Sequence, residues 1–416
     1  MAQFDLIIVG AGMVGATLAR AMLDTGLKIA LVDAMPLDEP VPFQRTASGY
    51  DPRVSTLSAA SEHILANLGV WQRIPAAACC AYQHMHVWDA EGTGQVSFDA
   101  ASLSEVRLGH IVENYRIQQA LLDSLAGTAV TLFGSQSVEG LVREEDGWRV
   151  MLAGGERLCA PLIVAADGAR SQVRELYGFD MREWDYLHDA IVTTVRTEKP
   201  HDDTAWQRFL PSGPLALLPL PDRDGAHYCS IVWSLKPELA ADIMALDDEA
   251  FRLELAAAFE GRLGEILAAD PRRRIPLRQR HAKRYAVPGL VLIGDAAHSI
   301  HPLAGQGVNL GLLDVAELYD VIVAALERGE DIASLHVLQR YERRRMGANL
   351  GMMAAMEGFE RLFDADALPL RWIRNTGMRL LDGQDVLKGG IIRRAMGLTG
   401  ALPELARDPQ LRAEKP

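Results

Sequence analysis

The sequence predicts an α/β fold: a Rossmann-type dinucleotide-binding unit, an inserted β-sheet domain and a set of C-terminal helices. Three observations support this prediction. The first 33 residues read as a buried strand, a glycine turn, an amphipathic helix and a second strand. Residues 181–284 contain runs that alternate apolar and polar side chains, which is typical of strands buried on one face. Residues 341–416 carry apolar side chains at helical spacing.

Composition narrows the class of protein. The chain has 416 residues, of which 49% are hydrophobic, so it is long enough for two or three globular domains. It carries 42 Lys and Arg against 55 Asp and Glu, a net charge of −13, which argues against a nucleic-acid-binding protein. No apolar run is long enough to span a membrane and the N-terminus lacks a signal-peptide pattern, so we expect a cytoplasmic protein.

Cysteine spacing gives no sign of a metal site. Cys79, Cys80, Cys159 and Cys229 form neither a CxxC pair nor a zinc-ligand pattern. We therefore expect reduced thiols and no bound metal.

The segment "FDLIIVGAGMVGATLARAMLDTGLKIALVD" forms the predicted βαβ unit. Gly10 permits the tight turn, Gly12 lets a pyrophosphate approach the helix N-terminus, and Gly15 lets helix and strand pack closely. Asp33 ends the second strand, where a carboxylate can accept hydrogen bonds from a ribose. This unit predicts dinucleotide binding and fits NAD and FAD equally well.

Two later stretches of the sequence decide between NAD and FAD. "LIVAADGARSQVR" (162–174) and "GLVLIGDAAHSIHPLAGQGVNLGLLDVAEL" (289–318) resemble the second and third signatures of the group A flavoprotein hydroxylases, the para-hydroxybenzoate hydroxylase class. The resemblance implies FAD as the cofactor. It also implies that Asp295, after Gly294, meets the ribityl chain, and that Asp167 with Gly168 shapes a loop near the pyrophosphate.

The bare turn that follows residue 301 predicts a second cofactor contact. "LAGQGVN" opens a predicted helix over 308–325, and several backbone N–H groups and the positive end of the helix dipole converge there. Such donors can stabilise the negative charge of a reduced flavin. The residues expected to take part are Pro302, Gly305, Gln306, Gly307, Val308 and Asn309, with Gln306 and Asn309 also offering side-chain amides.

A closer resemblance extends over nearly the whole chain. "HPLAGQGVNLG", "DPRVSTLSAASEHILANLGVW", "LGHIVEN" and "MRLLDGQDVLKGGIIRRAMGL" are similar to segments of the ubiquinone-biosynthesis hydroxylases, most of all to the branch that hydroxylates C5 of the ring. The resemblance places Arg53 near the pyrophosphate, and Asn114 and Arg116 near the isoalloxazine or ribityl group. Asp33 departs from the pattern, because many relatives carry Glu there.

The resemblance implies an FAD-dependent monooxygenase that hydroxylates a polyprenylated phenol with O2 and a reductant, NAD(P)H, through a flavin C4a-hydroperoxide. The residues themselves show no nucleophile triad and no acid–base pair, which is expected when the cofactor carries the reactive oxygen. His298 and His301 are candidates for proton transfer, although a structural role is favoured. No catalytic side chain is assigned. Other ring positions, an isoprenoid reductase and a non-catalytic flavin-stabilised subunit stay open as alternatives.

The predicted domains are interleaved in sequence. Residues 1–75, 105–180 and 285–340 form a discontinuous FAD-binding domain, residues 76–104 and 181–284 form the substrate domain, and residues 341–416 form a helical region. We expect these C-terminal helices to pack on the FAD-binding domain, with a surface that faces a membrane or a partner as the alternative. The basic stretch "RRRIPLRQRHAKR" (272–284) reads as a solvated strand, with anionic lipid or a partner protein as the alternative. Peripheral association with the inner face of the membrane, contact with other ubiquinone-biosynthesis proteins and a homo-oligomer also stay open.

Overall fold

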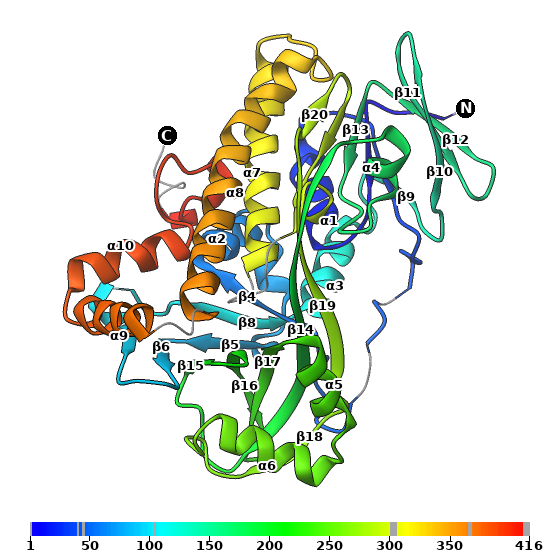
Figure 1. The fold of residues 1–416 in the computed structure, drawn as a ribbon. Helices are drawn as coiled ribbons and strands as arrows, with labels where there is room; N and C mark the ends of the chain where they lie inside the picture. Colours follow the sequence, from blue (N-terminus) through cyan, green and yellow to red (C-terminus); the bar gives the residue numbers. More distant parts are fainter. Residues whose placement is uncertain are drawn as a thin grey trace.

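The computed structural model describes residues 2–39, 41–43, 46–103, 105–299, 306–364 and 368–410. These residues form the predicted α/β architecture, in which a parallel sheet and a large antiparallel sheet lie one above the other along the molecule (Figure 1). All four cysteines are free thiols.

A six-stranded sheet, in the order β20-β21-β13-β2-β3-β9, forms the upper layer. Only β20 runs antiparallel to its neighbour. Five of these strands, all except β9, are buried at every position, because helices cover both faces of a parallel sheet. The strands are β2 (Leu6–Val9), β3 (Ile29–Val32), β9 (Thr131–Phe133), β13 (Leu162–Ala165), β20 (Ala286–Val287) and β21 (Leu290–Leu292).

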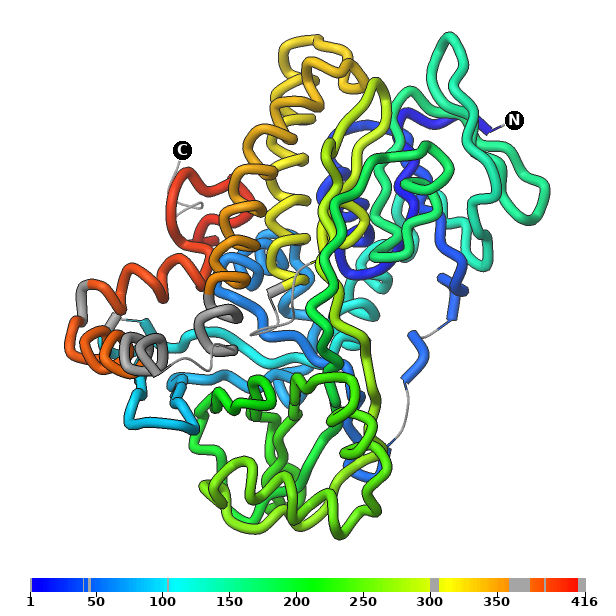
Figure 2. Tube along the Cα trace, in the orientation of Figure 1, coloured from blue at the N-terminus to red at the C-terminus, as the bar shows by residue number. Residues whose placement is uncertain are grey.

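Segments far apart in sequence meet in this layer, as the colours of Figure 2 show. Helix α1 follows β2 and packs against α3 and α7, so the predicted βαβ unit is confirmed. The helices are α1 (Met13–Ala21), α3 (Asn114–Leu125), α4 (Gln172–Tyr177) and α7 (Gln306–Glu327).

The second layer is a nine-stranded, mostly antiparallel sheet in the order β22-β19-β14-β17-β16-β15-β6-β7, with β18 paired to β14. Its strands are β6 (His84–Asp89), β7 (Gln95–Asp99), β14 (Met181–Thr197), β15 (Thr204–Leu210), β16 (Gly213–Arg223), β17 (Ala226–Leu235), β18 (Ile266–Ala269), β19 (Arg273–Ala282) and β22 (His298–Ser299). Strands from 84–99 and 181–282 thus share one sheet, which supports the predicted substrate domain.

Burial in the centre of this sheet differs from the predicted alternation. The second half of β14 and most of β17 are buried at consecutive positions. Helices α5 (Pro237–Ala245) and α6 (Asp248–Ala258) cover one face, and a second apolar cluster that includes Tyr50 and Leu220 covers the other. A strand covered on both faces has no side that faces solvent, so successive residues are buried whether they are polar or apolar.

Two small sheets complete the strands. One has the order β1-β12-β11-β10, and the other β4-β8-β5. Their bounds are β1 (Ala2–Gln3), β10 (Val138–Glu144), β11 (Gly147–Leu152), β12 (Arg157–Ala160), β4 (Val54–Ser58), β5 (Cys79–Tyr82) and β8 (Gly109–Glu113), and α2 (Ala59–Asn67) follows β4.

The C-terminal region is helical, as predicted, but its packing differs from the expectation. Helix α8 (Leu335–Asp364) lies along α7, and the predicted boundary at 340 falls inside it. We expected the following helices to pack on the flavin domain. Instead α9 (Leu368–Asp382) packs against β7, where the Asn375 amide accepts a hydrogen bond from Gly94 N at 2.6 Å, and α10 (Asp385–Ala395) adds Ile392 to the cluster around Tyr50.

Candidate functional site

The turn from β2 to α1 is shaped by two glycines that the packing requires. A Cβ on Gly10 would lie 2.4 Å from Ala166 O, and a Cβ on Gly15 would lie 1.8 Å from Gly10 O. At Gly12, the N-cap of α1, a Cβ would meet no protein atom within 4 Å. The space before the helix N-terminus is therefore kept free of side chains, which suits a phosphate group.

Asp33 holds this turn in place. One carboxylate oxygen accepts a hydrogen bond from Ala11 N at 2.6 Å, and the other accepts one from Met35 N at 2.7 Å. The side chain thus lies beside the glycine turn, where a ribose contact is expected.

The second predicted loop follows β13. Asp167 accepts a hydrogen bond from Val173 N at 3.2 Å through Oδ2, while Oδ1 is buried without a hydrogen-bond partner among the described residues. Burial raises the pKa of Asp167, and the polar groups of Ser171 and the nearby backbone oppose this. An unpaired, buried acceptor of this kind fits a polar ligand at the loop.

Arg174 links this loop to the third turn. Its guanidinium is buried and donates to Ala169 O at 2.8 Å and to Ala296 O at 3.1 Å. Arg174 lies inside the quoted motif, but its role could not be identified from the sequence, because nothing local shows that it reaches the Ala296 carbonyl of another turn.

The third turn runs from β21 into a short 3₁₀ helix, Gly294–Ala296. Gly294 has φ +57°, and a Cβ there would lie 3.2 Å from Val14 of α1. A Cβ on Gly307 would lie 4.0 Å from Asp295 Oδ1. The start of α1, the Asp295 turn and the start of α7 therefore meet at one place.

Asp295 is the accessible carboxylate at this meeting point. Although solvent reaches its side chain, the surrounding protein penalises its charged form and raises its pKa, while His298 and Arg53 act in the opposite direction. This is the environment of a recessed carboxylate, which suits hydrogen bonds from the hydroxyl groups of a ligand.

The predicted contacts at the start of α7 are only partly described. Pro302, Gly305 and His301 lie outside the described residues, and so does the side chain of Gln306, whose backbone begins α7. Val308 is half-buried.

Asn309 requires a correction. Its amide was expected to face the cofactor, but Nδ2 donates to Thr56 O at 2.8 Å, and Oδ1 accepts from Ser58 N at 2.9 Å and Ser61 Oγ at 2.7 Å. The amide therefore anchors α7 to β4 and α2. Only the backbone of Asn309 remains a candidate for cofactor contact.

The two predicted arginines face different surroundings. Arg53 is exposed and close enough to Asp295 to influence its pKa. Arg116 instead has its Nε 4.0 Å from Glu113 Oε2 and its guanidinium 4.7 Å from the Tyr115 ring centroid. Arg53 is therefore brought to the meeting point, whereas the contacts of Arg116 are with its own helix start.

His298 is buried, and its Nε2 lies 2.5 Å from Asp314 Oδ2. This supports the structural role that was favoured for it. Asp314 itself was not identified from the sequence, since a lone acid in an amphipathic helix reads as a solvated residue.

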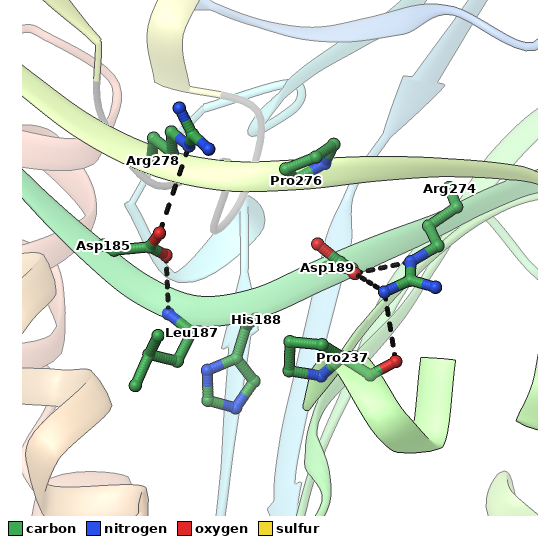
Figure 3. Close-up of a pocket in the computed structure, with 8 residues that line it drawn as sticks. All are labelled: Asp185, Leu187, His188, Asp189, Pro237, Arg274, Pro276 and Arg278. Atoms are coloured by element: carbon green, nitrogen blue, oxygen red, sulfur yellow. Dashed lines mark hydrogen bonds and ion pairs between the residues drawn. The ribbon is translucent and has the colours of Figure 1, made fainter. Parts of the chain in front are cut away.

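A pocket of about 470 Å³ lies apart from the motif residues, between β14, β19 and the start of α5 (Figure 3). Arg274 contacts Asp189 at 2.5 Å, and Arg278 lies 4.0 Å from Asp185. Both arginines that line this pocket are thus paired with acidic residues.

Among the described residues, no helix is both long enough and apolar enough to cross a membrane.

Comparisons with known proteins agree with this geometry. An FAD binding domain family matches residues 3–354. The 3-demethoxyubiquinol 3-hydroxylase of Escherichia coli K12 is 41% identical over 397 residues, covering 95% of this chain and 98% of that protein. The human mitochondrial ubiquinone biosynthesis monooxygenase COQ6 is 32% identical over 437 residues, covering 94% of this chain and 92% of that protein.

Solved structures show the same fold at low identity. The p-nitrophenol 4-monooxygenase PnpA from Pseudomonas putida DLL-E4 matches with a TM-score of 0.77 and 19% identity, covering 96% of this chain and 99% of that one. A single-residue variant of HpxO from Klebsiella pneumoniae, solved with FAD, matches with a TM-score of 0.72 and 19% identity, covering 95% of this chain and 99% of that one.

Proposed function

This chain belongs to the family of FAD-dependent ubiquinone-biosynthesis hydroxylases, with the para-hydroxybenzoate hydroxylase fold, and from that premise we propose that it hydroxylates the ring of a polyprenylated phenol. It is an FAD-dependent monooxygenase, for which NAD(P)H is the expected reductant. The specific activity that we propose is C5 hydroxylation, that of a 2-polyprenylphenol hydroxylase.

The observation that carries the proposal is the convergence of three turns. β21, β13 and β2 are adjacent and parallel, so the turns that follow them lie at the same edge of the sheet. There a side-chain-free helix start at Gly12, an orphaned oxygen of Asp167 and the accessible carboxylate of Asp295 come together. These groups fit an extended dinucleotide with a polyol.

We assign the cofactor contacts accordingly. Gly12 lies at the pyrophosphate, Asp33 at the adenosine ribose and Asp295 at the ribityl chain. The further proposed contacts are Gly10, Gly15, Arg53, Arg116, Asp167, Gly294, Pro302, Gly305, Gln306, Gly307, Val308 and the backbone of Asn309. Arg116 is the weakest member of this set, because its contacts are with Glu113 and Tyr115.

Bound FAD supplies the chemistry, which is the activation of O2 and the transfer of one oxygen atom to the ring. The protein binds and orients the cofactor and the substrate. The start of α7 lies beside Asp295, and its backbone N–H groups would stabilise negative charge on a bound, reduced flavin. Gly307→Val would push this backbone away, and we expect the flavin midpoint potential to fall. The corresponding free energy should be smaller than the 2.7–4 kcal/mol, roughly, that one donor contributes in a dry site.

A second candidate is another ring position, which the 41% identity to 3-demethoxyubiquinol 3-hydroxylase favours. Quinone intermediates that accumulate in a strain lacking this gene would distinguish the two. A polyprenylphenol without the C5 oxygen supports our proposal, whereas a demethoxyubiquinol supports the second candidate.

The analysis of quinone intermediates and the visible spectrum of the flavin also test the two remaining alternatives, an isoprenoid reductase and a non-catalytic subunit. Accumulation of chains with unreduced double bonds would indicate an isoprenoid reductase. A flavin that is neither bleached by NAD(P)H and phenol nor restored by O2 would indicate a non-catalytic subunit.

We further propose that the protein associates peripherally with the membrane, through the α9–α10 hairpin. Leu380, Leu387 and Ile391 are 65%, 59% and 44% exposed there, and they are interspersed with exposed arginines at 379, 393 and 394. Exposed aliphatic groups with basic neighbours suit an anionic lipid surface.

The basic segment 272–284 is a poorer candidate. Arg274, Arg278 and Arg280 pair with acidic residues across the β14–β19 ladder. Flotation with vesicles that contain phosphatidylglycerol tests the choice. Leu387→Glu should abolish binding, while Leu253→Glu, at a 66% exposed leucine of α6, should not. Equal binding by both variants would contradict the assignment.

A further inference from the structure

One buried carboxylate, next to the Asp295 turn, joins three segments of the chain. Asp314 of α7 is fully buried. Its Oδ2 accepts from Gly294 N at 3.0 Å and lies 2.5 Å from His298 Nε2. Its Oδ1 accepts from Arg345 Nε at 2.7 Å and from Asn349 Nδ2 at 3.3 Å. The β21 turn, α7 and α8 are thus joined at one side chain.

The carboxylate is held in its charged form. Burial by itself would raise the pKa of Asp314, but His298 and Arg345 outweigh burial and hold the pKa below its usual range. Because a carboxylate only accepts hydrogen bonds, Nε2 of His298 must carry a proton. A buried charge of this kind is tolerated only while its partners stay in place, so the group resists displacement.

A second set of contacts fixes the partners. Asn349 Nδ2 also donates to the Tyr285 hydroxyl at 3.3 Å, and that hydroxyl lies 2.9 Å from His281 Nε2. His281 of β19 is the pairing partner of His298 of β22. Burial and His298 lower the pKa of His281 to about 4, so it is neutral at physiological pH. His298 is therefore held from both sides, by Asp314 and by its sheet neighbour.

Residues 294 and 298 flank Asp295 along the chain, and both are held by Asp314. The Gly294 amide fixes the backbone immediately before Asp295, and His298 fixes the backbone after it. A fully buried group therefore holds residues on both sides of the accessible carboxylate of Asp295.

We propose that Asp314 is a positioning residue of the cofactor site, which orients Asp295 toward the ribityl hydroxyls through Gly294 and His298 and is itself oriented by Arg345 and Asn349. The inference rests on the proposed placement of FAD at Asp295.

The test compares Asp314→Asn with Asp189→Asn. Asp189 is a matched control, because it is also buried and paired with an arginine, Arg274 at 2.5 Å, in the pocket of Figure 3. Both variants should lower the stability of the apoprotein. Only Asp314→Asn should weaken FAD in a titration of apoprotein, by about tenfold, and change the visible circular dichroism of the bound flavin. A matching loss of stability with an unchanged FAD affinity would overturn the proposal.

A double-mutant cycle identifies the route of the effect. If Asp314 acts through Asp295, then Asp314→Asn should weaken FAD by less than about twofold in an Asp295→Ala background. An undiminished effect in that background would show that Asp314 does not act through Asp295. If Asp295→Ala alone leaves FAD affinity unchanged, the proposed FAD placement fails instead, so the two failures are distinguishable.

A milder variant keeps the proposal testable if Asp314→Asn does not fold. Arg345→Lys retains the positive charge but loses the planar donor that fixes Asp314. We expect a smaller increase in the FAD dissociation constant, about threefold, with the same change in the flavin spectrum. A folded Arg345→Lys protein with wild-type affinity and spectrum would overturn the positioning role.

Discussion

The turn after β2 and the turn that carries Asp295 lie at the same edge of one parallel sheet, yet they are held by different forces. The first is shaped by missing side chains, since Gly10 and Gly15 sit where a Cβ would overlap backbone atoms. The second is held by buried charges, with Asp314 joining Gly294, His298 and Arg345. The glycine turn needs close packing but no particular side-chain partner, whereas the charged turn needs specific side chains from two helices, α7 and α8.

The largest effect that we expect comes from filling the first turn. A Cβ on Gly15 would lie 1.8 Å from Gly10 O, so Gly15→Ala should destabilise the apoprotein by about 3 kcal/mol in urea unfolding. Gly347→Ala in α8 is the control, because a Cβ there meets nothing within 4 Å. It should stabilise the protein by up to about 1 kcal/mol. Equal effects at both positions would show that the β2–α1 contact is not tight.

Gly12→Val should separate cofactor binding from folding. Its side chain would enter space that no protein atom occupies, so the apoprotein should keep its stability to within about 1 kcal/mol. FAD affinity should fall by about 100-fold, or about 2.7 kcal/mol, because the branched side chain would lie where we place the pyrophosphate. Full FAD occupancy of this variant would refute that placement.

In the second turn, Asp295→Ala should weaken FAD by roughly 1–3 kcal/mol, the usual cost of removing a hydrogen-bond partner in a buried site. Asp180→Ala serves as a control, since this exposed aspartate lies 3.5 Å from Lys283 in a surface ion pair. An affinity for FAD within a factor of about two of wild type would make the Asp295 turn a purely structural one.

The smallest effect tests what a half-buried carboxylate costs when no cation pairs with it directly. Asp320 lies on the same helix as Asp314, but burial raises its pKa to about 6, and its Oδ1 has no hydrogen-bond partner among the described residues. Since the folded pKa exceeds the unfolded value, the fold loses stability as pH rises from the unfolded pKa, about 4, to the folded pKa, about 6. Asp320→Asn should therefore stabilise the protein by about 1 kcal/mol at pH 7.5, where this loss is complete, and by almost nothing near pH 3, below both pKa values.

Urea unfolding of the wild type and of Asp320→Asn at the two pH values measures this difference. Asn retains an acceptor for Glu404 N, which donates to Asp320 Oδ2 at 2.9 Å, so the hydrogen bond is not the variable. A gain that is independent of pH would point to a cause other than charge.

Local sequence was sufficient for the parts of the site that depend on local sterics. The apolar runs before Gly10, Asp167 and Gly294 form β2, β13 and β21, because continuous hydrophobic stretches become strands covered on both faces. The helix predicted over 308–325 is α7, which extends slightly further in both directions. The glycines could be assigned because the missing Cβ is visible in the sequence itself, whichever backbone packs against it, such as Ala166 O beside Gly10.

Tertiary structure decided which polar side chains serve the cofactor and which serve the fold. The Asn309 amide contacts β4 and α2, and Arg174 contacts the Asp295 turn, although neither partner lies nearby in sequence. Asp314 reads as an ordinary helix residue until α8 brings Arg345 against it. The physical reason is that a hydrogen bond or an ion pair needs two specific groups, and the local sequence shows only one of them. A glycine acts by lacking a side chain, and the sequence shows that directly.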